Sequence, residues 1–152
     1  MKTDNTLWHS RFLNLAKQIA SFSKDPSTKV GCVLVRDRRI ISTGYNGFPR
    51  GISDSFERLN DREHKYEMTV HAEINAVTTA ALHGVSTEGS TAYVTFQPCS
   101  RCAAVLINAG IREVYVTADS IIPDRWLDNM ILAANLLKEA GILLTTLDPY
   151  EP

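Results

Sequence analysis

Apolar residues recur at helical spacing in four segments of the chain. The first segment predicts a helix over residues 7–22, with an apolar stripe made of Trp8, Phe12, Leu15, Ile19 and Phe22. A second helix is expected from Val70 to just before Gly84, with Ile74, Val77 and Ala81 on its apolar face. The other two are expected over residues 100–107 and from about residue 126 to Gly141, the last with a stripe of Trp126, Met130, Ala133 and Leu137.

Five shorter segments have the patterns of β-strands. Residues 30–35 form a continuous apolar run, which is typical of a strand buried on both faces. A polar turn over residues 36–39 leads to a second strand over 40–45, so a hairpin is expected. Three more strands are expected over residues 91–96, 113–117 and 142–147. Strands that alternate with helices predict an α/β fold in three layers, in which a mostly parallel five-stranded sheet carries helices on both faces and the hairpin adds one antiparallel pair.

The segment between the second strand and the second helix has no clear period. Residues 44–51 contain three glycines and a proline, which indicates a loop. Residues 52–66 are polar and charged, and we expect them to form part of a loop insertion that spans residues 47–70. No linker interrupts the rest, so the chain, residues 1–152, is expected to be a single domain.

Composition excludes several classes of protein. The chain has 152 residues, of which 44% are hydrophobic and 22% charged, so a folded domain is expected. The formal net charge is −1, which argues against a protein that binds the phosphate backbone of nucleic acid. No apolar run reaches the roughly 18 residues of a membrane helix, and the polar start does not resemble a signal peptide. Three cysteines in such a chain indicate metal or thiol chemistry in a cytoplasmic protein.

Two short strings carry candidate chemistry. His71-Ala72-Glu73 opens one predicted helix, and Pro98-Cys99-Ser100-Arg101-Cys102 lies at a strand-to-helix turn. A separation of 28 positions between His71 and Cys99 allows the starts of two neighbouring helices to meet at one edge of the sheet. Two thiolates and an imidazole would then hold Zn²⁺ and leave a fourth position open, as in catalytic zinc sites. Glu73 lies two residues after His71, where it can act as a base beside that open position.

The cysteines also have less specific interpretations. Two cysteines three positions apart also occur in structural zinc sites and in redox dithiols. The His-x-Glu string at the start of a helix favours the catalytic alternative. Cys32 lies among valines in a predicted strand, where a buried core thiol is the expected role.

The two strings resemble those of the zinc-dependent cytidine and deoxycytidylate deaminase superfamily. Residues 23–31, 44–51, 70–76 and 109–114 further resemble the deoxycytidylate (dCMP) deaminase branch, and the likeness covers about residues 7–146. The resemblance implies a cytidine-deaminase-like fold and the hydrolytic deamination of dCMP to dUMP and ammonia.

The resemblance also implies roles for individual residues. His71, Cys99 and Cys102 would hold Zn²⁺, and Glu73 would transfer protons between water, N3 of the pyrimidine and the departing ammonia. Asn46 is similar to an asparagine that contacts the sugar. The 5′-phosphate is expected to lie near the turn over residues 24–29, where Lys24, Ser27 and Lys29 supply charge and hydrogen-bond donors. Ala72 is a further expected substrate contact.

Many members of this branch are homohexamers that dCTP activates and dTTP inhibits. The resemblance therefore implies a homo-oligomer, with a hexamer favoured, and a regulatory loop whose candidate residues are Gly44, Tyr45, Gly47, Phe48 and Arg50. Some members bind a second, structural zinc ion. Residues 47–70 contain no cysteine and one histidine, His64, so a second zinc site is not expected here.

Three alternative functions stay open at this point. The enzyme could deaminate dCTP as well as dCMP, since the sequence does not define the space beyond the first phosphate. A tRNA adenosine deaminase would share both zinc strings, although the net charge and the Gly-Tyr-Asn-Gly loop argue against RNA. A zinc-stabilised nucleotide-sensing module without catalysis is the third, and the presence of Glu73 with all three ligands counts against it.

Overall fold

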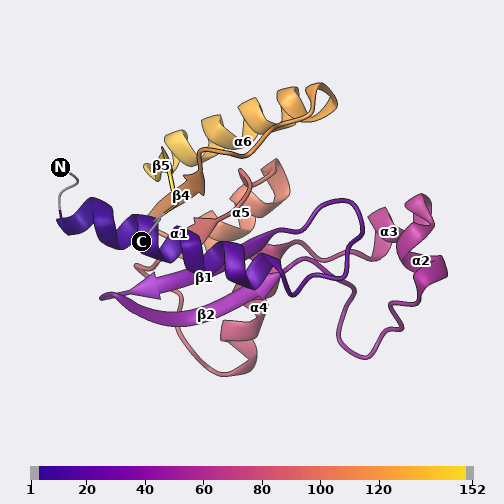
Figure 1. Ribbon diagram of the computed structural model, residues 1–152. Coiled ribbons are helices and arrows are strands. Elements are labelled where there is room, and N and C mark those ends of the chain that lie inside the picture. The colour runs from indigo at the N-terminus through magenta and orange to yellow at the C-terminus, as the bar shows by residue number, and fades with distance from the viewer. Residues whose placement is uncertain (1–3, 150–152) are drawn as a thin grey trace.

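A five-stranded sheet lies at the centre of the protein, whose computed structural model describes residues 4–149 (Figure 1). The strands are β1 (Gly31–Arg36), β2 (Arg39–Tyr45), β3 (Thr91–Val94), β4 (Glu113–Thr117) and β5 (Leu143–Leu147). The helices are α1 (Asp4–Ala20), α2 (Phe56–Asn60), α3 (Arg62–Met68), α4 (Ala72–Leu82), α5 (Ser100–Asn108) and α6 (Leu127–Glu139), with a 3-10 turn η1 (Asp124–Trp126) before α6. Among these helices, none has the length and apolarity that crossing a membrane requires.

The strand order is β2-β1-β3-β4-β5, and the sheet is mixed. The prediction of a single antiparallel pair was wrong, because β1 is antiparallel to both β2 and β3. The crossover through α4 carries the chain from β2 past β1 to β3, and such a crossover makes the strands it joins parallel. Since β1 lies between them, it runs against both neighbours. The remaining pairs, β3 with β4 and β4 with β5, are parallel as predicted.

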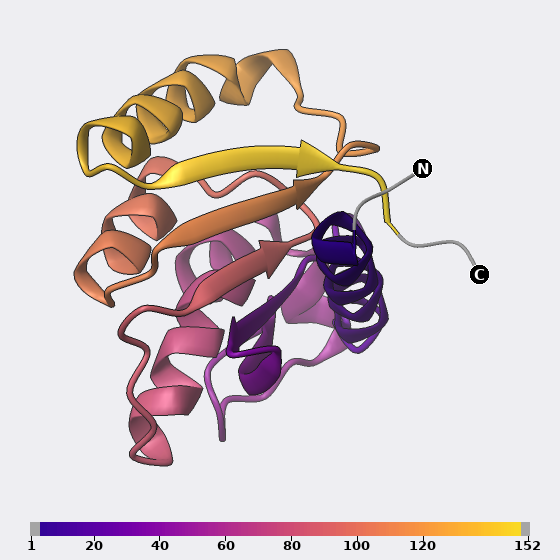
Figure 2. The same cartoon turned by 90° about the vertical axis from the view of Figure 1, so that its left-hand side faces the viewer.

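Helices cover both faces of the sheet, as expected, but unequally (Figure 2). Helix α1 packs on one face, where Phe12, Leu13 and Ala16 contact side chains of β1, β3 and β4. Helices α4, α5 and α6 pack on the other face and enclose the larger apolar core. The chemistry-bearing helices α4 and α5 therefore lie side by side on the same face of the sheet.

The apolar stripe predicted for the first helix is partly wrong. Leu15 and Phe22 are 41% and 55% exposed, whereas the small residues Ala16 and Ala20 are buried. A Cβ atom added to Gly31 of β1 would lie 2.0 Å from the carbonyl oxygen of Ala16. Helix α1 thus approaches β1 so closely that small side chains must form the contact, and small residues contribute weakly to a hydrophobic period.

Close packing also displaces the predicted face of the second helix. In α4 the fully buried apolar residues are Ala72, Ala76 and Ala80. Of the predicted face, Ile74 and Val77 are half-buried and Ala81 is exposed. The close contact is with Gly44 of β2, where an added Cβ atom would lie 2.4 Å from the Ala72 carbonyl oxygen. This contact brings the start of α4 close to the sheet.

The insertion over residues 47–70 was predicted to be a loop, and this prediction was partly wrong. It contains the short helices α2 and α3, whose first turns are capped by the side chains of Ser55 and Asp61. Neither helix buries a residue, which explains why no hydrophobic period announced them. Figure 1 shows both helices projecting to one side of the sheet. Lys65 of α3 forms an ion pair with Asp25, which holds the insertion against the turn that follows α1.

Candidate active site

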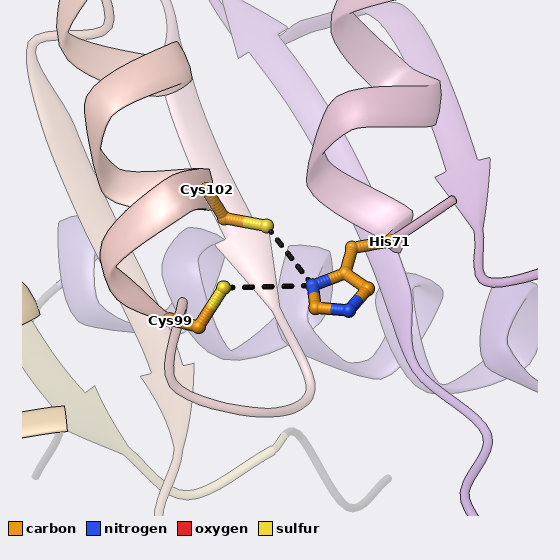
Figure 3. A group of neighbouring side chains, drawn as sticks. All are labelled: His71, Cys99 and Cys102. Atoms are coloured by element: carbon orange, nitrogen blue, oxygen red, sulfur yellow. Dashed lines mark hydrogen bonds between the residues drawn. The ribbon is translucent and has the colours of Figure 1, made fainter. Parts of the chain in front are cut away.

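Three side chains with metal-binding atoms converge where α4 and α5 begin (Figure 3). The Nδ1 atom of His71 lies 3.3 Å from Sγ of Cys102 and 3.5 Å from Sγ of Cys99. All three donor atoms lie within 4.8 Å of one another. In a tetrahedral zinc site, Zn–S bonds of about 2.3 Å and Zn–N bonds of about 2.0 Å place nitrogen and sulfur roughly 3.5 Å apart. The donor set and its spacing therefore fit Zn²⁺.

The backbone at the two helix starts explains this convergence. His71 and Cys99 are the N-cap residues of α4 and α5, and both have extended backbone angles. Neither side chain makes the hydrogen bond of a helix cap, so both are free to face the shared site. Cys102 lies in the first turn of α5 and presents its sulfur to the same point. The structure thus brings together the three ligands expected from the sequence.

The two thiols differ in how easily they ionise. Hydrogen bonds with Cys102 and His71 lower the pKa of Cys99 to about 4 despite burial. The hydrogen bond with Cys99 and burial raise the pKa of Cys102 well above its usual range. The protein alone therefore stabilises one thiolate and resists a second. A divalent cation would stabilise both, which is the charge state that a zinc site requires.

Glu73 lies on the first turn of α4, two residues after His71, and is 4% exposed. Burial raises the pKa of its carboxyl group, while a hydrogen bond from its own backbone N–H and the charge of His71 oppose that increase. A carboxyl group with a raised pKa holds a proton more readily, which suits a group that accepts a proton and then returns it. Glu73 is therefore suited to proton transfer beside the candidate zinc site.

A cavity of about 530 Å³ opens onto these groups. His71, Glu73 and Cys99 contribute to its lining, together with an apolar set made of Phe96, Trp126 and Met130. Residues of the insertion line it as well, namely Leu59, Asn60, Arg62, Lys65, Tyr66 and Thr69. Its volume lies within the range of sites that hold small molecules, and it combines an apolar wall with a few polar groups.

Asn46 reaches this cavity from the end of β2 and is buried. Its Oδ1 atom accepts a hydrogen bond from the Val30 N–H at 2.8 Å, and its Nδ2 atom donates to the Thr28 carbonyl oxygen at 2.8 Å. The amide thus fixes the segment before β1 against the end of β2. One N–H and one lone pair of the amide remain for a ligand.

The structure places some of the predicted substrate contacts in the lining of the cavity and others outside it. Ser27 and Ala72 line the cavity, but Lys24 and Lys29 do not. Lys24 instead forms an ion pair with Asp54 at 3.0 Å, and Lys29 lies at a separate shallow depression beside Lys17. Asp25 accepts hydrogen bonds from the backbone N–H groups of Ser27 and Thr28, which stabilise the turn.

The candidate regulatory residues lie around the end of β2. Gly44 packs against α4, whereas Tyr45 is exposed and contacts Phe22 edge-on at 6.1 Å between ring centres. Gly47 pairs with Val70 through two backbone hydrogen bonds. Phe48 is half-buried and Arg50 is exposed. These contacts link the loop directly to the residue that precedes His71.

Sequence reasoning missed residues that support the site from a distance. Asn129 of α6 accepts a hydrogen bond from the Ser100 N–H and donates one to the Ser100 hydroxyl, both at 2.9 Å. Gln97 donates to the Met130 carbonyl oxygen at 2.8 Å. These bonds hold the turn that carries Cys99 against α6. The partners are 29 and 33 positions apart, so no local pattern could have identified them.

Comparisons with known proteins agree with this geometry. A family model described as the cytidine and deoxycytidylate deaminase zinc-binding region matches residues 6–118. An uncharacterized deaminase in the luxG 3′ region of Aliivibrio fischeri is 41% identical over 143 residues, covering 92% of this chain and 93% of that protein. The deoxycytidylate deaminase of Mus musculus is 34% identical over 155 residues, covering 97% and 84%. The human deoxycytidylate deaminase is 37% identical over 125 residues, covering 78% and 69%.

The fold is likewise similar to a solved structure. The crystal structure of a dCMP deaminase from the cyanophage S-TIM5 matches with a TM-score of 0.72 and 23% identity. The match covers 97% of this chain and 100% of that one. The likeness extends to the mixed five-stranded sheet and the helices on its two faces, so the expected cytidine-deaminase-like fold is confirmed.

Proposed function

The chain belongs to the cytidine and deoxycytidylate deaminase family, and on that basis we propose that it hydrolytically deaminates dCMP to dUMP and ammonia. The substrate class is supported by relatives named deoxycytidylate deaminase in mouse and human, which are 34% and 37% identical. One structural observation carries the chemistry. The donor atoms of His71, Cys99 and Cys102 converge, and His71 and Cys99 line a cavity together with the buried carboxyl group of Glu73.

His71, Cys99 and Cys102 are the residues that would hold the zinc ion. When bound, Zn²⁺ supplies the Lewis acidity that makes water a nucleophile near neutral pH. In this proposal Glu73 accepts a proton from the attacking water and delivers it to N3 of the pyrimidine. A second proton from water then goes to the amino group, so that the C4–N bond breaks as the new C4–O bond becomes a carbonyl. The balance is one water consumed and one ammonia released.

The shape of the cavity suits a nucleotide whose base enters first. The aromatic side chains of Phe96 and Trp126 give the cavity an apolar wall on which a pyrimidine can pack. The amide of Asn46 remains available for a sugar hydroxyl, as the resemblance implied. Ala72 and Ser27 line the same cavity and complete the proposed substrate contacts.

Ammonia release tests this proposal directly. The purified full chain, with its zinc content measured, is supplied in parallel with dCMP, dCTP, deoxycytidine and a tRNA anticodon stem. We expect rapid ammonia release from dCMP. We expect no ammonia release from the RNA, whose adenosine should not be converted to inosine. Turnover of dCTP at a similar rate would extend the proposal to a dual-substrate enzyme. Zinc-loaded protein that releases no ammonia from dCMP would overturn it in favour of the tRNA enzyme or the nucleotide-sensing module.

We further propose regulation by dCTP and dTTP in a homo-oligomer, as the resemblance implied. The arrangement of the loop supports this, because Asn46 lines the cavity while its neighbour Tyr45 is exposed. The main-chain bonds between Gly47 and Val70 offer a route from that surface to His71. Gly44 packs against α4, so we assign it a role in helix packing and not in contact with an effector. Light scattering would give the oligomer size, and a rate curve against dCMP that neither nucleotide changes would contradict the regulation.

A cytoplasmic location also belongs to this proposal. The three cysteines are all unpaired, and two of them are needed as zinc ligands. Thiols persist in a reducing compartment, which supports the location. Imaging of a tagged full-length chain would test it.

A further inference from the structure

Two arginines and a tyrosine form a cluster at the rim of the cavity. We name Arg62 and Tyr66 of α3, together with Arg125 of η1, the rim cluster, and all three line the cavity that opens onto the zinc ligands. The Arg62 Nη2 atom lies 3.5 Å from the Tyr66 hydroxyl, and its guanidinium carbon lies 5.4 Å from the centre of the Tyr66 ring. The charge of Arg125 also contributes to lowering the pKa of the Tyr66 hydroxyl. The insertion and the segment before α6 thus both supply an arginine to the lining of the same cavity.

The two guanidinium groups of the rim cluster are not neutralised by ion pairs. Within residues 4–149, no carboxylate lies within 4.0 Å of either group. Lys65, the third cation that lines the cavity, differs because it is paired with Asp25 at 2.8 Å. The positive charge that the cavity offers to a ligand is therefore concentrated at Arg62 and Arg125. The lowered pKa of the Tyr66 hydroxyl, caused first by its bond with Arg62, reflects that charge.

We propose that Arg62 and Arg125 bind the phosphate of the substrate nucleotide and set the preference for a nucleotide over a nucleoside. This inference rests on the proposed function and adds specificity-determining residues to it. A guanidinium group presents a planar fork of donors that matches phosphate oxygens, and two such groups match a dianion. Their exposed position at the rim suits a phosphate that stays hydrated while the base enters the apolar interior.

The position of the rim cluster also explains a role for the insertion. Arg62 is carried by α3, which the ion pair between Lys65 and Asp25 anchors to the wall of the cavity. Helix α3 therefore holds Arg62, the proposed phosphate-binding residue, in place at the rim of the cavity. The rival cations, Lys24 and Lys29, lie outside the cavity, as described above.

The test compares kcat/KM for dCMP and for deoxycytidine in Arg62→Gln and Arg125→Gln. We expect a loss of roughly 10- to 100-fold on dCMP in each variant, as for a lost hydrogen-bonded charge pair, and a change of less than about twofold on deoxycytidine. Arg62→Lys keeps the charge but not the fork, so it should recover part of the loss. The matched control is Arg58→Gln, because Arg58 lies in the same insertion and donates instead to the Ser53 carbonyl oxygen. The control should match the wild type on both substrates.

Melting temperatures show whether each variant is folded, and the exposed side chains should leave them unchanged. The inference is overturned if both variants keep the wild-type ratio of kcat/KM values, or if Lys24→Gln and Lys29→Gln lose dCMP turnover while the arginine variants do not. Equal use of dCMP and deoxycytidine by the wild type overturns it and leaves deamination standing. A zinc-loaded wild type that deaminates neither substrate overturns the proposed function and this inference together.

Discussion

The ammonium group of Lys65 lies 2.8 Å from the carboxylate of Asp25, and their side chains are only 17% and 8% exposed. The same carboxylate accepts hydrogen bonds from the backbone N–H groups of Ser27 and Thr28, at 2.8 and 3.0 Å. One side chain thus joins the turn after α1 to helix α3 of the insertion. Because both segments line the cavity, this pair controls the shape of the candidate substrate site.

Acid should weaken this junction. The bonds with Lys65 and with the turn outweigh burial, the largest single effect, and hold the pKa of Asp25 below its usual 3.8. A carboxyl group whose pKa is lower in the folded state stabilises the fold above about pH 4 and loses that contribution as the pH falls through its folded pKa. We expect Asp25→Asn to cost about 1–3 kcal/mol of unfolding free energy at pH 7 and to lose less stability than the wild type between pH 5 and pH 3. Urea unfolding across that pH range measures both, and parallel curves for the two proteins would contradict the assignment.

Glu73→Gln separates proton transfer from metal binding. The amide keeps the size of the side chain but cannot accept a proton from water. We expect the variant to retain zinc at the wild-type ratio and to lose about 10²- to 10⁴-fold in kcat for dCMP. Metal analysis and ammonia release are the two measurements. A rate close to that of the wild type would show that another group transfers the proton.

Cys99→Ala should remove the metal and part of the stability. Zinc that binds only the folded chain stabilises it, so its loss should cost about 3 kcal/mol or more. The control is Cys32→Ala, which removes a thiol that is fully buried in β1 and whose pKa burial raises. That variant should keep its zinc. Calorimetry with and without a chelator compares the two, and a metal-free Cys99→Ala protein with unchanged melting would refute the coupling.

Gly44 of β2 and Gly47, which follows that strand, should respond differently to substitution by alanine. A methyl group at Gly44 would lie 2.4 Å from backbone atoms of α4, whereas nothing lies within 4 Å of one at Gly47. We expect Gly44→Ala to lower the unfolding free energy by about 1–3 kcal/mol and Gly47→Ala to change it by less than about 1 kcal/mol. Denaturant titrations of the two variants test this. Equal effects would mean that the close packing of α4 on β2 is not what requires glycine.

Asn129 should influence the zinc site without touching it. Its bonds to Ser100 hold the start of α5, where the candidate zinc ligands Cys99 and Cys102 lie. We expect Asn129→Ala to weaken zinc affinity about 10-fold, as for other residues that orient ligands. Asn135→Ala is a matched control, since Asn135 is an exposed asparagine of the same helix. Competition with a zinc-binding dye measures the affinities, and the role fails if the two variants bind zinc equally.

Several features of the protein followed from the sequence alone. The run of apolar residues over 30–35 predicted β1, and the strand over residues 113–117 was predicted with the bounds observed. The convergence of the candidate metal ligands could be predicted because His71 and Cys99 lie where two helices begin, and local sequence largely determines where a helix begins. Short-range patterns carry this information, since hydrogen bonds and side-chain periods within one element involve neighbours in the chain.

Tertiary structure alone decided which residues share the cavity. The helices of the insertion bury no residue, so no period marked them, yet α3 brings Arg62 and Tyr66 to the rim. Lys24 and Lys29 have suitable chemistry but lie outside the cavity, where Lys24 pairs with Asp54 and Lys29 lies beside a separate depression. The apolar pattern also gave the wrong buried positions in α1 and α4, because close packing on the sheet selects small residues there. Sequence spacing encodes the local conformation, whereas the approach of distant elements depends on packing between side chains that are far apart in the chain.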